Sequence, residues 1–175
     1  MSYNYVVQND RIGLRVLDEA DVTDRYLAWF RDDSITAFLS AKNLSRQEVV
    51  DHLNLGRASG DFEMLAICIL ESGLHVGNIK VGPIDKVNRL ADLPIVLGDR
   101  NYHGKGIASE AVDLGSQYAL EKLSIRKVCG SVFSGNKASL ACYQKAGWHI
   151  ECVLPNQFEI NNEIHDEVFI ARYKD

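Results

Sequence analysis

Hydrophobic and polar positions alternate in some stretches of the chain and follow helical spacing in others. Residues 11–17 alternate, which predicts a half-buried strand. Apolar residues recur at helical spacing over 19–30, where Asp18 is a plausible N-cap. Ser45 and Glu48 form an S-x-x-E capping box, so a second helix is expected to begin there.

The middle of the chain reads as strands followed by a long helix. Residues 64–70 and 76–81 predict a hairpin, and a loop is expected over 83–90. A short apolar strand over 94–97 stops directly before a glycine-rich loop. The next helix carries the clearest apolar stripe, at Ala111, Leu114, Gly115, Tyr118 and Ala119.

The last part of the chain adds a strand over 127–133 and a helix that Asn136 caps and that runs to about Ala146. Two closing strands are expected at 148–154 and 165–172. The predicted order is strand, two helices, three strands, helix, strand, helix and two strands, or β-α-α-β-β-β-α-β-α-β-β. This order matches neither a β-sandwich nor a Rossmann alternation.

Length and composition predict one α/β domain over residues 1–175. The chain has 46% apolar residues, and none of its apolar runs approaches the roughly 20 residues of a membrane helix, so we expect a cytoplasmic protein without a membrane partner. The formal net charge of −5 argues against a nucleic-acid surface. No C-x-x-C pairing is present, so we expect no metal and interpret the cysteines as buried small hydrophobes: Cys68, Cys129, Cys142 and Cys152.

The loop over residues 103–108 lies between the short strand and the long helix. Two glycines in three residues let the backbone turn tightly with its N–H groups exposed, and the helix N-terminus adds partial positive charge. Such a loop can hold a pyrophosphate, although a simple turn is the alternative. Neither the nucleotide P-loop pattern nor the third glycine of G-x-G-x-x-G is present, since Ser109 stands there.

Two segments resemble the GNAT acetyltransferase superfamily. Residues 97–111 are similar to its acetyl-CoA loop, Q/R-x-x-G-x-G/A, in which Gly106 and Ala108 match and His103 replaces the usual Gln or Arg. Residues 136–148 are similar to its N-x-x-[AS]-x-x-x-Y-x-K-x-G-[FW] helix. The resemblance implies the GNAT fold, a central, mostly antiparallel sheet flanked by helices.

The resemblance also implies an acetyl-CoA-dependent N-acetyltransferase. It makes Tyr143 the general acid that protonates the leaving thiolate, with a half-buried core tyrosine as the alternative. It puts the acetyl-CoA contacts on Val96, Leu97, Gly98, His103, Gly104, Lys105, Gly106, Ile107, Ala108, Ser109 and Asn136. Asn136 could instead be an ordinary N-cap, and Lys105 and Lys145 approach the phosphates or are solvated.

The base that takes the amine proton is left open. His75, Asp99, Ser131 and His149 lie on or beside strands near the expected cleft, and a water chain would serve equally well.

The acceptor is the least determined part. Residues 25–33 and 76–81 resemble a branch that contains ribosomal-protein N-terminal acetyltransferases and enzymes acting on nucleotide-linked amino sugars. Tyr26 and Trp29 could stack on a sugar or base, or belong to the core. We expect a small-molecule amine, with an amino sugar preferred, and keep a protein N-terminus and a non-catalytic acyl-CoA-binding module as alternatives. A homodimer is left open.

Overall fold

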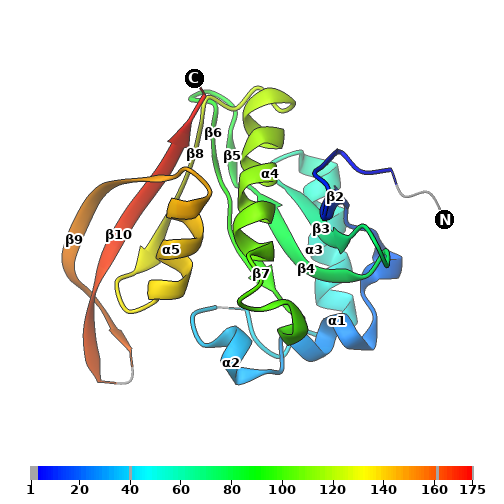
Figure 1. The fold of residues 1–175 in the computed structure, drawn as a ribbon, viewed down its shortest axis with the longest axis horizontal. Coiled ribbons are helices and arrows are strands. Elements are labelled where there is room, and N and C mark those ends of the chain that lie inside the picture. The colour runs from blue at the N-terminus through cyan, green and yellow to red at the C-terminus, as the bar shows by residue number, and fades with distance from the viewer. Residues whose placement is uncertain (1–3, 40, 161, 175) are drawn as a thin grey trace.

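The structure, a computed structural model, describes residues 4–39, 41–160 and 162–174. Its elements follow one another from the N-terminus to the C-terminus as Figure 1 shows. They are β1 (Val7–Gln8), β2 (Ile12–Val16), η1 (Glu19–Asp21), α1 (Asp24–Trp29), α2 (Asp33–Thr36), α3 (Arg46–Ser59), β3 (Glu63–Ile69), β4 (His75–Val81), β5 (Ile84–Asp85), β6 (Leu90–Asp92), β7 (Ile95–Leu97), η2 (Arg100–Tyr102), α4 (Ile107–Glu121), β8 (Lys127–Phe133), α5 (Lys137–Lys145), β9 (His149–Ile160) and β10 (Glu163–Tyr173).

The strands form two five-stranded sheets. One has the order β1-β2-β3-β4-β7, and the other has the order β5-β6-β8-β10-β9. The pairs are antiparallel except for β6 with β8, which run parallel. The mostly antiparallel mixed α/β fold expected from the sequence is therefore confirmed.

The two sheets meet where one extended segment changes partner at Leu93 and Pro94. β6, before this point, pairs with β8, whereas β7, after it, pairs with β4. Pro94 has no N–H to donate, and its carbonyl accepts from Lys80 N at 3.0 Å. β7 consequently diverges from β8 and leaves an opening in the sheet.

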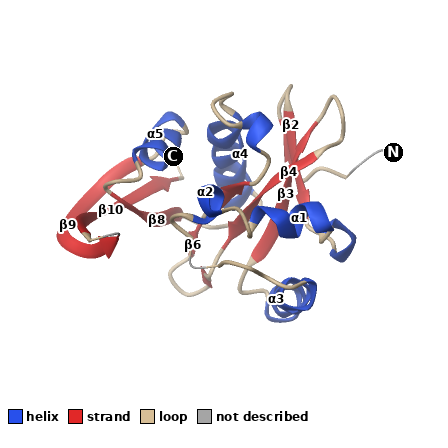
Figure 2. Ribbon diagram, turned by 90° about the horizontal axis from the view of Figure 1, so that it is seen from below, coloured by secondary structure: helices blue, strands red, loops and turns tan. Residues whose placement is uncertain are grey.

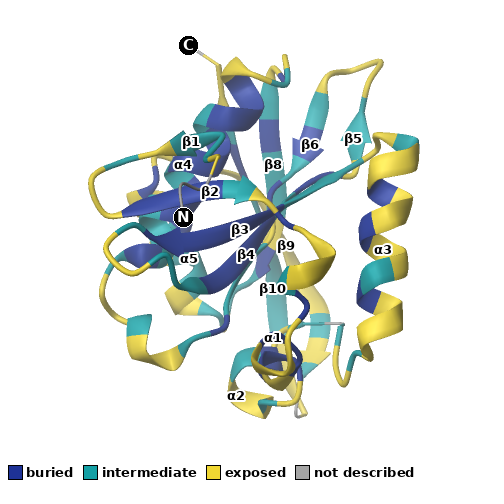
Figure 3. Ribbon diagram, turned by 90° about the vertical axis from the view of Figure 1, so that its right-hand side faces the viewer, coloured by how far each residue is buried: buried dark blue, intermediate teal, exposed yellow. Residues whose placement is uncertain are grey.

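Helices cover both faces of the sheets. α4 and α5 lie on one face, and α1 and α3 lie on the other (Figure 2). Gly115 of α4 approaches Ile79 of β4 so closely that an added Cβ would lie 3.1 Å from its Cδ1. α3 turns a buried stripe toward the sheet and an exposed face outward (Figure 3), with Val49 and Leu53 buried. Each face therefore has its own apolar cluster.

The helix expected over 19–30 is interrupted. Asp18 does act as an N-cap, but of the short 3₁₀ helix η1, and the extended Thr23 then caps α1 separately. The Ser45–Glu48 capping box of α3 is confirmed. The sequence reading missed β1, α2, β5 and β6, which are two to four residues long and too short for a periodic pattern to identify.

Two expectations from composition, on membrane helices and on the cysteines, can be compared with the structure. No helix among the described residues is long and apolar enough to cross a membrane. Cys68 is buried, but Cys129 and Cys142 are half-buried and Cys152 is exposed on β9. The prediction that all four cysteines are buried is therefore wrong, and Cys152 is exposed because β9 is an edge strand with both faces largely open.

Candidate active site

The N-terminus of α4 is open toward the glycine-rich loop. Its N-cap is Gly106, with φ of 81° and no side-chain cap hydrogen bond. The backbone N–H groups of Ile107, Ala108 and Ser109 belong to the first turn, where an α-helix offers no internal acceptor. Gly104, with φ of 70°, has no atom within 4 Å of the position a Cβ would take. The loop therefore presents backbone donors to an accessible space, as an anion site requires.

Cationic groups lie beside this loop. Lys145 Nζ, from the end of α5, lies 3.6 Å from the position of a Cβ on Gly106, and Glu110 Oε1 lies 3.9 Å from the same position. Arg11 donates from Nη2 to the carbonyl of Lys105 at 3.1 Å and forms an ion pair with Glu110. The two contacts of Arg11 brace the loop against β2, while Lys145 adds positive charge at its centre.

His103 turns back toward the strand that precedes the loop. Its Nε2 donates to the carbonyl of Leu97 at 2.8 Å. The imidazole therefore stabilises the shape of the loop, and this contact differs from the ligand contact that the resemblance implies for this position.

Some backbone N–H and C=O groups of β7 point toward β4, and others point toward the opening. Gly98 N donates to Val76 O at 2.9 Å, and the carbonyl of Pro94 accepts from β4 as described above. Because backbone groups alternate in direction along a strand, Val96 also faces β4, and Leu97 faces the opening. Of Val96, Leu97 and Gly98, which are expected to contact acetyl-CoA, Leu97 is the one whose N–H points there.

On the other side of the opening, β8 has a glycine with open space beside it. Gly130 of β8 has no atom within 4 Å of its would-be Cβ. The uncapped start of α4, the N–H of Leu97 and the bare position at Gly130 are therefore the features on which a donor site can be proposed.

Tyr143 reaches the point where β6 and β7 separate. Its hydroxyl donates to the carbonyl of Leu93 at 2.7 Å, and its ring packs against Trp148 at a centroid distance of 4.8 Å. The side chain is buried, and burial raises the pKa of the phenol. Tyr143 therefore keeps its proton over the working pH range, next to the break in the sheet.

Asn136 begins the same helix as its N-cap. Its Oδ1 accepts from Ser139 N at 3.1 Å. The cap uses only the carbonyl oxygen of the side chain, so the amide nitrogen is the group that a pantetheine amide would meet.

The candidate bases are spread over several elements. Burial lowers the pKa of His75, whose Nε2 contacts the Gly77 carbonyl at 2.9 Å. Asp99 accepts from Arg25 at 2.6 Å and caps η2. Ser131 on β8 and His149 at the start of β9 are exposed. The structure does not bring these four residues together.

Asp92, which the sequence reading missed, is the last residue of β6 and directly precedes the break. Burial raises the pKa of this half-buried carboxyl, and Cys129 Sγ lies 3.5 Å from its Oδ1. A carboxyl with a raised pKa next to the opening is suited to accept a proton. The proline at position 94 could have identified Asp92 from the sequence, because a proline interrupts strand pairing shortly after it.

A cavity of about 480 Å³ lies on the face opposite α4 and α5, between α1, α3, β4 and β7. Its polar lining residues are Glu48, His52, Asn78 and Lys80. Its other lining residues are mainly apolar and include Tyr26, Phe30, Val49, Leu53, Met64, Ile95 and Val96. The cavity therefore touches β7 on the side away from α4 and α5.

Contacts from α1 close the end of this region. A Cβ on Gly98 would lie 2.0 Å from Cδ2 of Trp29, so the indole packs directly on the backbone after β7. Tyr26 and Trp29 are both buried, which agrees with the core interpretation of these aromatics. Arg25 of α1 holds Asp99 of the η2 cap, and Arg100 pairs with Asp32 at 2.8 Å.

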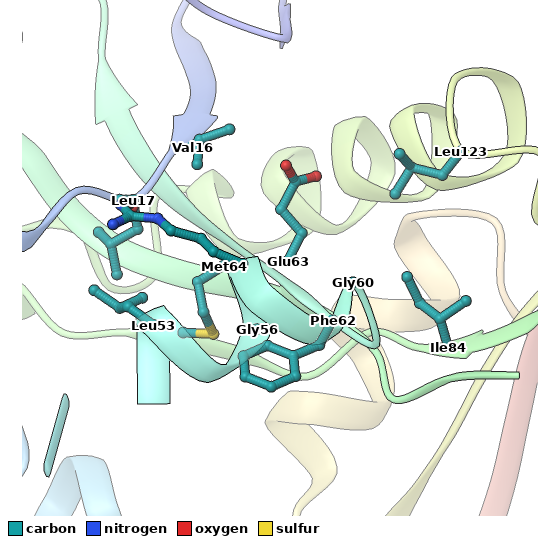
Figure 4. A pocket seen from close by; sticks show the side chains of 11 residues that line it. Val16, Leu17, Leu53, Gly56, Gly60, Phe62, Glu63, Met64, Ile84 and Leu123 are labelled. Carbon is teal, nitrogen blue, oxygen red and sulfur yellow. Dashed lines mark hydrogen bonds between the residues drawn. The ribbon is translucent and has the colours of Figure 1, made fainter. Parts of the chain in front are cut away.

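A second cavity of about 390 Å³ lies beyond the C-terminal half of α3 (Figure 4). It shares Leu53 and Met64 with the first cavity and also contacts Leu123 after α4. Its carboxylate, Glu63, accepts from Tyr118 at 2.8 Å. This cavity does not border the break in the sheet.

Among residues 4–39, 41–160 and 162–174, no group of three or more His, Cys, Asp or Glu side chains could hold a metal ion.

Comparisons with known proteins connect this geometry to a family. A model described as acetyltransferase (GNAT) domain matches residues 11–149. The spermidine N(1)-acetyltransferase of Escherichia coli K12 is 23% identical over 159 residues, which cover 91% of this chain and 80% of that protein. YdaF of Bacillus subtilis, a putative ribosomal N-acetyltransferase, is 27% identical over 118 residues, 67% of this chain and 64% of that one.

A solved structure shares the fold over nearly the whole chain. Spermidine N-acetyltransferase from Vibrio cholerae, in complex with CoA and spermine, matches with a TM-score of 0.83 at 19% identity. The match covers 94% of this chain and 96% of that one.

Proposed function

The chain belongs to the GNAT family of acetyl-CoA-dependent N-acetyltransferases, and from this premise we propose how its residues divide the reaction. The N–H groups at the start of α4, with Gly104, Gly106 and Lys145, bind the diphosphate of acetyl-CoA. Leu97 and Asn136 bind the pantetheine arm. The observation that carries this assignment is the uncapped N-terminus of α4 beside the break in the sheet.

In the chemical step, the amine nitrogen attacks the thioester carbonyl carbon, and the C–S bond breaks. Tyr143 gives its proton to the departing thiolate, moving its hydroxyl away from the Leu93 carbonyl. The phenol is the weaker acid by about 1.5 pKa units, so this transfer is slightly uphill, and the phenolate takes a proton back from solvent once coenzyme A has left. Asp92, through a water molecule, takes the proton that the amine loses.

The acceptor enters from the cavity bounded by α1 and α3, because that cavity meets β7 on the face away from the α4 N-terminus. Donor and acceptor then approach the opening from opposite sides. The relatives described above include polyamine and ribosomal acetyltransferases, so the amino-sugar preference has no support, and we retain a primary amine. A protein N-terminus and a homodimer stay predictions.

A charge added to the loop tests the donor site. We expect Gly104→Asp to weaken acetyl-CoA binding at least tenfold in calorimetry, because its carboxylate would face the diphosphate. Gly60→Asp is the matched control, since Gly60 ends α3 with φ of 62° and its would-be Cβ meets only Lys86 Nζ, at 3.8 Å.

Gly60→Asp should bind acetyl-CoA as the wild type does. Equal affinity in the Gly104→Asp variant would reject the loop as the diphosphate site. Binding of acetyl-CoA without release of coenzyme A in the presence of any amine would favour the non-catalytic module instead.

A further inference from the structure

Asn78 has a buried donor without a partner in the cavity between α1 and α3. The residue is 3% exposed, and its Nδ2 has no hydrogen-bond partner among the described residues. A buried donor left without an acceptor is unfavourable by about 1–3 kcal/mol. Such a group in a substrate cavity indicates a ligand that supplies the acceptor.

The orientation of the Asn78 amide follows from its neighbour. His75 Nε2 lies 2.9 Å from both the Gly77 carbonyl and Asn78 Oδ1. Because a carbonyl can only accept, Nε2 must carry the hydrogen, and it is therefore Oδ1 of Asn78 that faces it. His75 in turn packs edge-on against Trp29 at 5.2 Å, which fixes the carbonyl end of the amide and leaves Nδ2 as the end without a partner, on a residue that lines the cavity.

Lys80 gives the same wall of the cavity a positive charge. It lies two residues after Asn78 on β4, and their Cα atoms are about 7 Å apart on the same face. Its Nζ lies 4.4 Å from the ring centroid of Phe62, against which His52 stacks. Burial, and then the charge of Lys80, lower the pKa of His52, so the neutral form of this imidazole is favoured.

The cavity is poor in free carboxylates. Glu48 is the acidic residue among those that line it, and its Oε2 already accepts from Ser45 N at 2.8 Å and Ser45 Oγ at 2.6 Å. A polyamine would bring several ammonium groups next to Lys80, and the carboxylates to balance them are Glu48, already paired with Ser45, and Asp92, which itself interacts with Lys80. The apolar walls and the two nitrogen donors suit the opposite chemistry.

We propose, on the basis of the function argued above, that the acceptor is an amino acid with a large apolar side chain. Its carboxylate accepts from Asn78 Nδ2 and faces Lys80, its side chain packs against Tyr26, Phe30 and Val49, and its α-amine takes the acetyl group. Asn78 and Lys80 are then the residues that determine acceptor specificity.

The test compares four amines with acetyl-CoA saturating. L-phenylalanine carries a carboxylate, L-phenylalanine amide a neutral carbonyl, phenethylamine neither, and spermidine only further amines. We expect kcat/KM for L-phenylalanine to exceed that for phenethylamine by about 10- to 100-fold, the worth of one hydrogen bond to a charged group. Spermidine should be the poorest of the four.

Two variants keep the proposal testable if one fails to fold. Asn78→Leu and Lys80→Met should each reduce the ratio of kcat/KM for L-phenylalanine to that for phenethylamine about tenfold or more. Asn78→Gln, which keeps a donor, should recover part of the ratio. Calorimetry with L-phenylalanine and the coenzyme A complex should show the same order of affinities.

Three results would overturn the proposal. One is a higher kcat/KM for spermidine than for L-phenylalanine, and another is a ratio that neither variant changes. The third is equal use of L-phenylalanine amide, which would indicate a peptide N-terminus. If no amine turns over, absent binding of L-phenylalanine rejects the proposal, whereas failure of acetyl-CoA itself to bind rejects the donor site.

Discussion

Tyr143→Phe removes a hydroxyl that has a structural contact and a proposed chemical role, and the two effects can be measured separately. The hydroxyl donates to the buried carbonyl of Leu93 at 2.7 Å. Without it, that acceptor loses its side-chain partner, at about 1–3 kcal/mol. For a chain of this length each kcal/mol lowers Tm by about 2–4 °C, so we expect a decrease of about 2–12 °C.

The chemical effect should be larger than the structural one. If Tyr143 protonates the thiolate, its removal should lower kcat by about 10²- to 10⁴-fold, the usual range for a lost general acid. The dissociation constant for acetyl-CoA should change little, since the diphosphate and pantetheine contacts come from other residues. A steady-state assay of coenzyme A release measures kcat, and calorimetry measures the dissociation constant for acetyl-CoA.

Tyr118→Phe is the matched control. Tyr118 is also a buried tyrosine whose hydroxyl donates to a carboxylate, in this case to the half-buried Glu63 Oε2 at 2.8 Å, and it lies in the C-terminal half of α4. It should lower Tm and leave kcat unchanged. A wild-type kcat in Tyr143→Phe, or equal losses of kcat in the two variants, would refute Tyr143 as the acid.

Two further predictions concern stability. Gly98→Ala should destabilise the protein by about 1–3 kcal/mol in denaturant unfolding and shift tryptophan emission, because the new methyl would overlap the ring of Trp29. An unchanged unfolding free energy and an unchanged emission would show that the indole moves aside without cost. The second prediction concerns Asp21, which is paired with Arg15 at 2.6 Å. Burial works to raise the pKa of Asp21, but the hydrogen bonds from Arg15 and the Asp18 backbone lower it overall. The pair therefore stabilises the fold above about pH 4 and loses this effect as pH falls through the folded pKa of Asp21. The Tm should fall less steeply on acidification in Asp21→Asn than in the wild type, and parallel curves of Tm against pH would contradict this prediction.

The features of the proposed donor site that the structure shows could be predicted from the sequence because they are local. Glycines at 104 and 106 take positive φ angles that other residues rarely adopt, and the helix that follows needs no side-chain cap if an anion takes its place. The position of Lys145 depends on how α5 packs on α4, so the sequence offered it only as an alternative to a solvated lysine.

The acceptor cavity could not be predicted, because four elements far apart in the chain form it. The pairing of β3 with β4 shifts register after Ile67, so that Cys68 opposes His75 and Ile67 opposes Gly77. This extra residue in β4 puts His75 and Asn78 on the same face, although three residues apart in a regular strand they would lie on opposite faces. A strand pattern alone gives no sign of it.

The exchange of partners at Leu93 and Pro94 links the two sites physically. If the strand continued along β8, the sheet would be closed, and Tyr143 would have no carbonyl at its edge to reach. If the segment that forms β6 and β7 paired with β4 along its whole length, it would not reach β8, and the space beside Gly130 would be bounded by β8 alone. In the proposed arrangement, this change of partner lets an amine from the α1 and α3 side and a thioester from the α4 side meet at one point without sharing a binding surface.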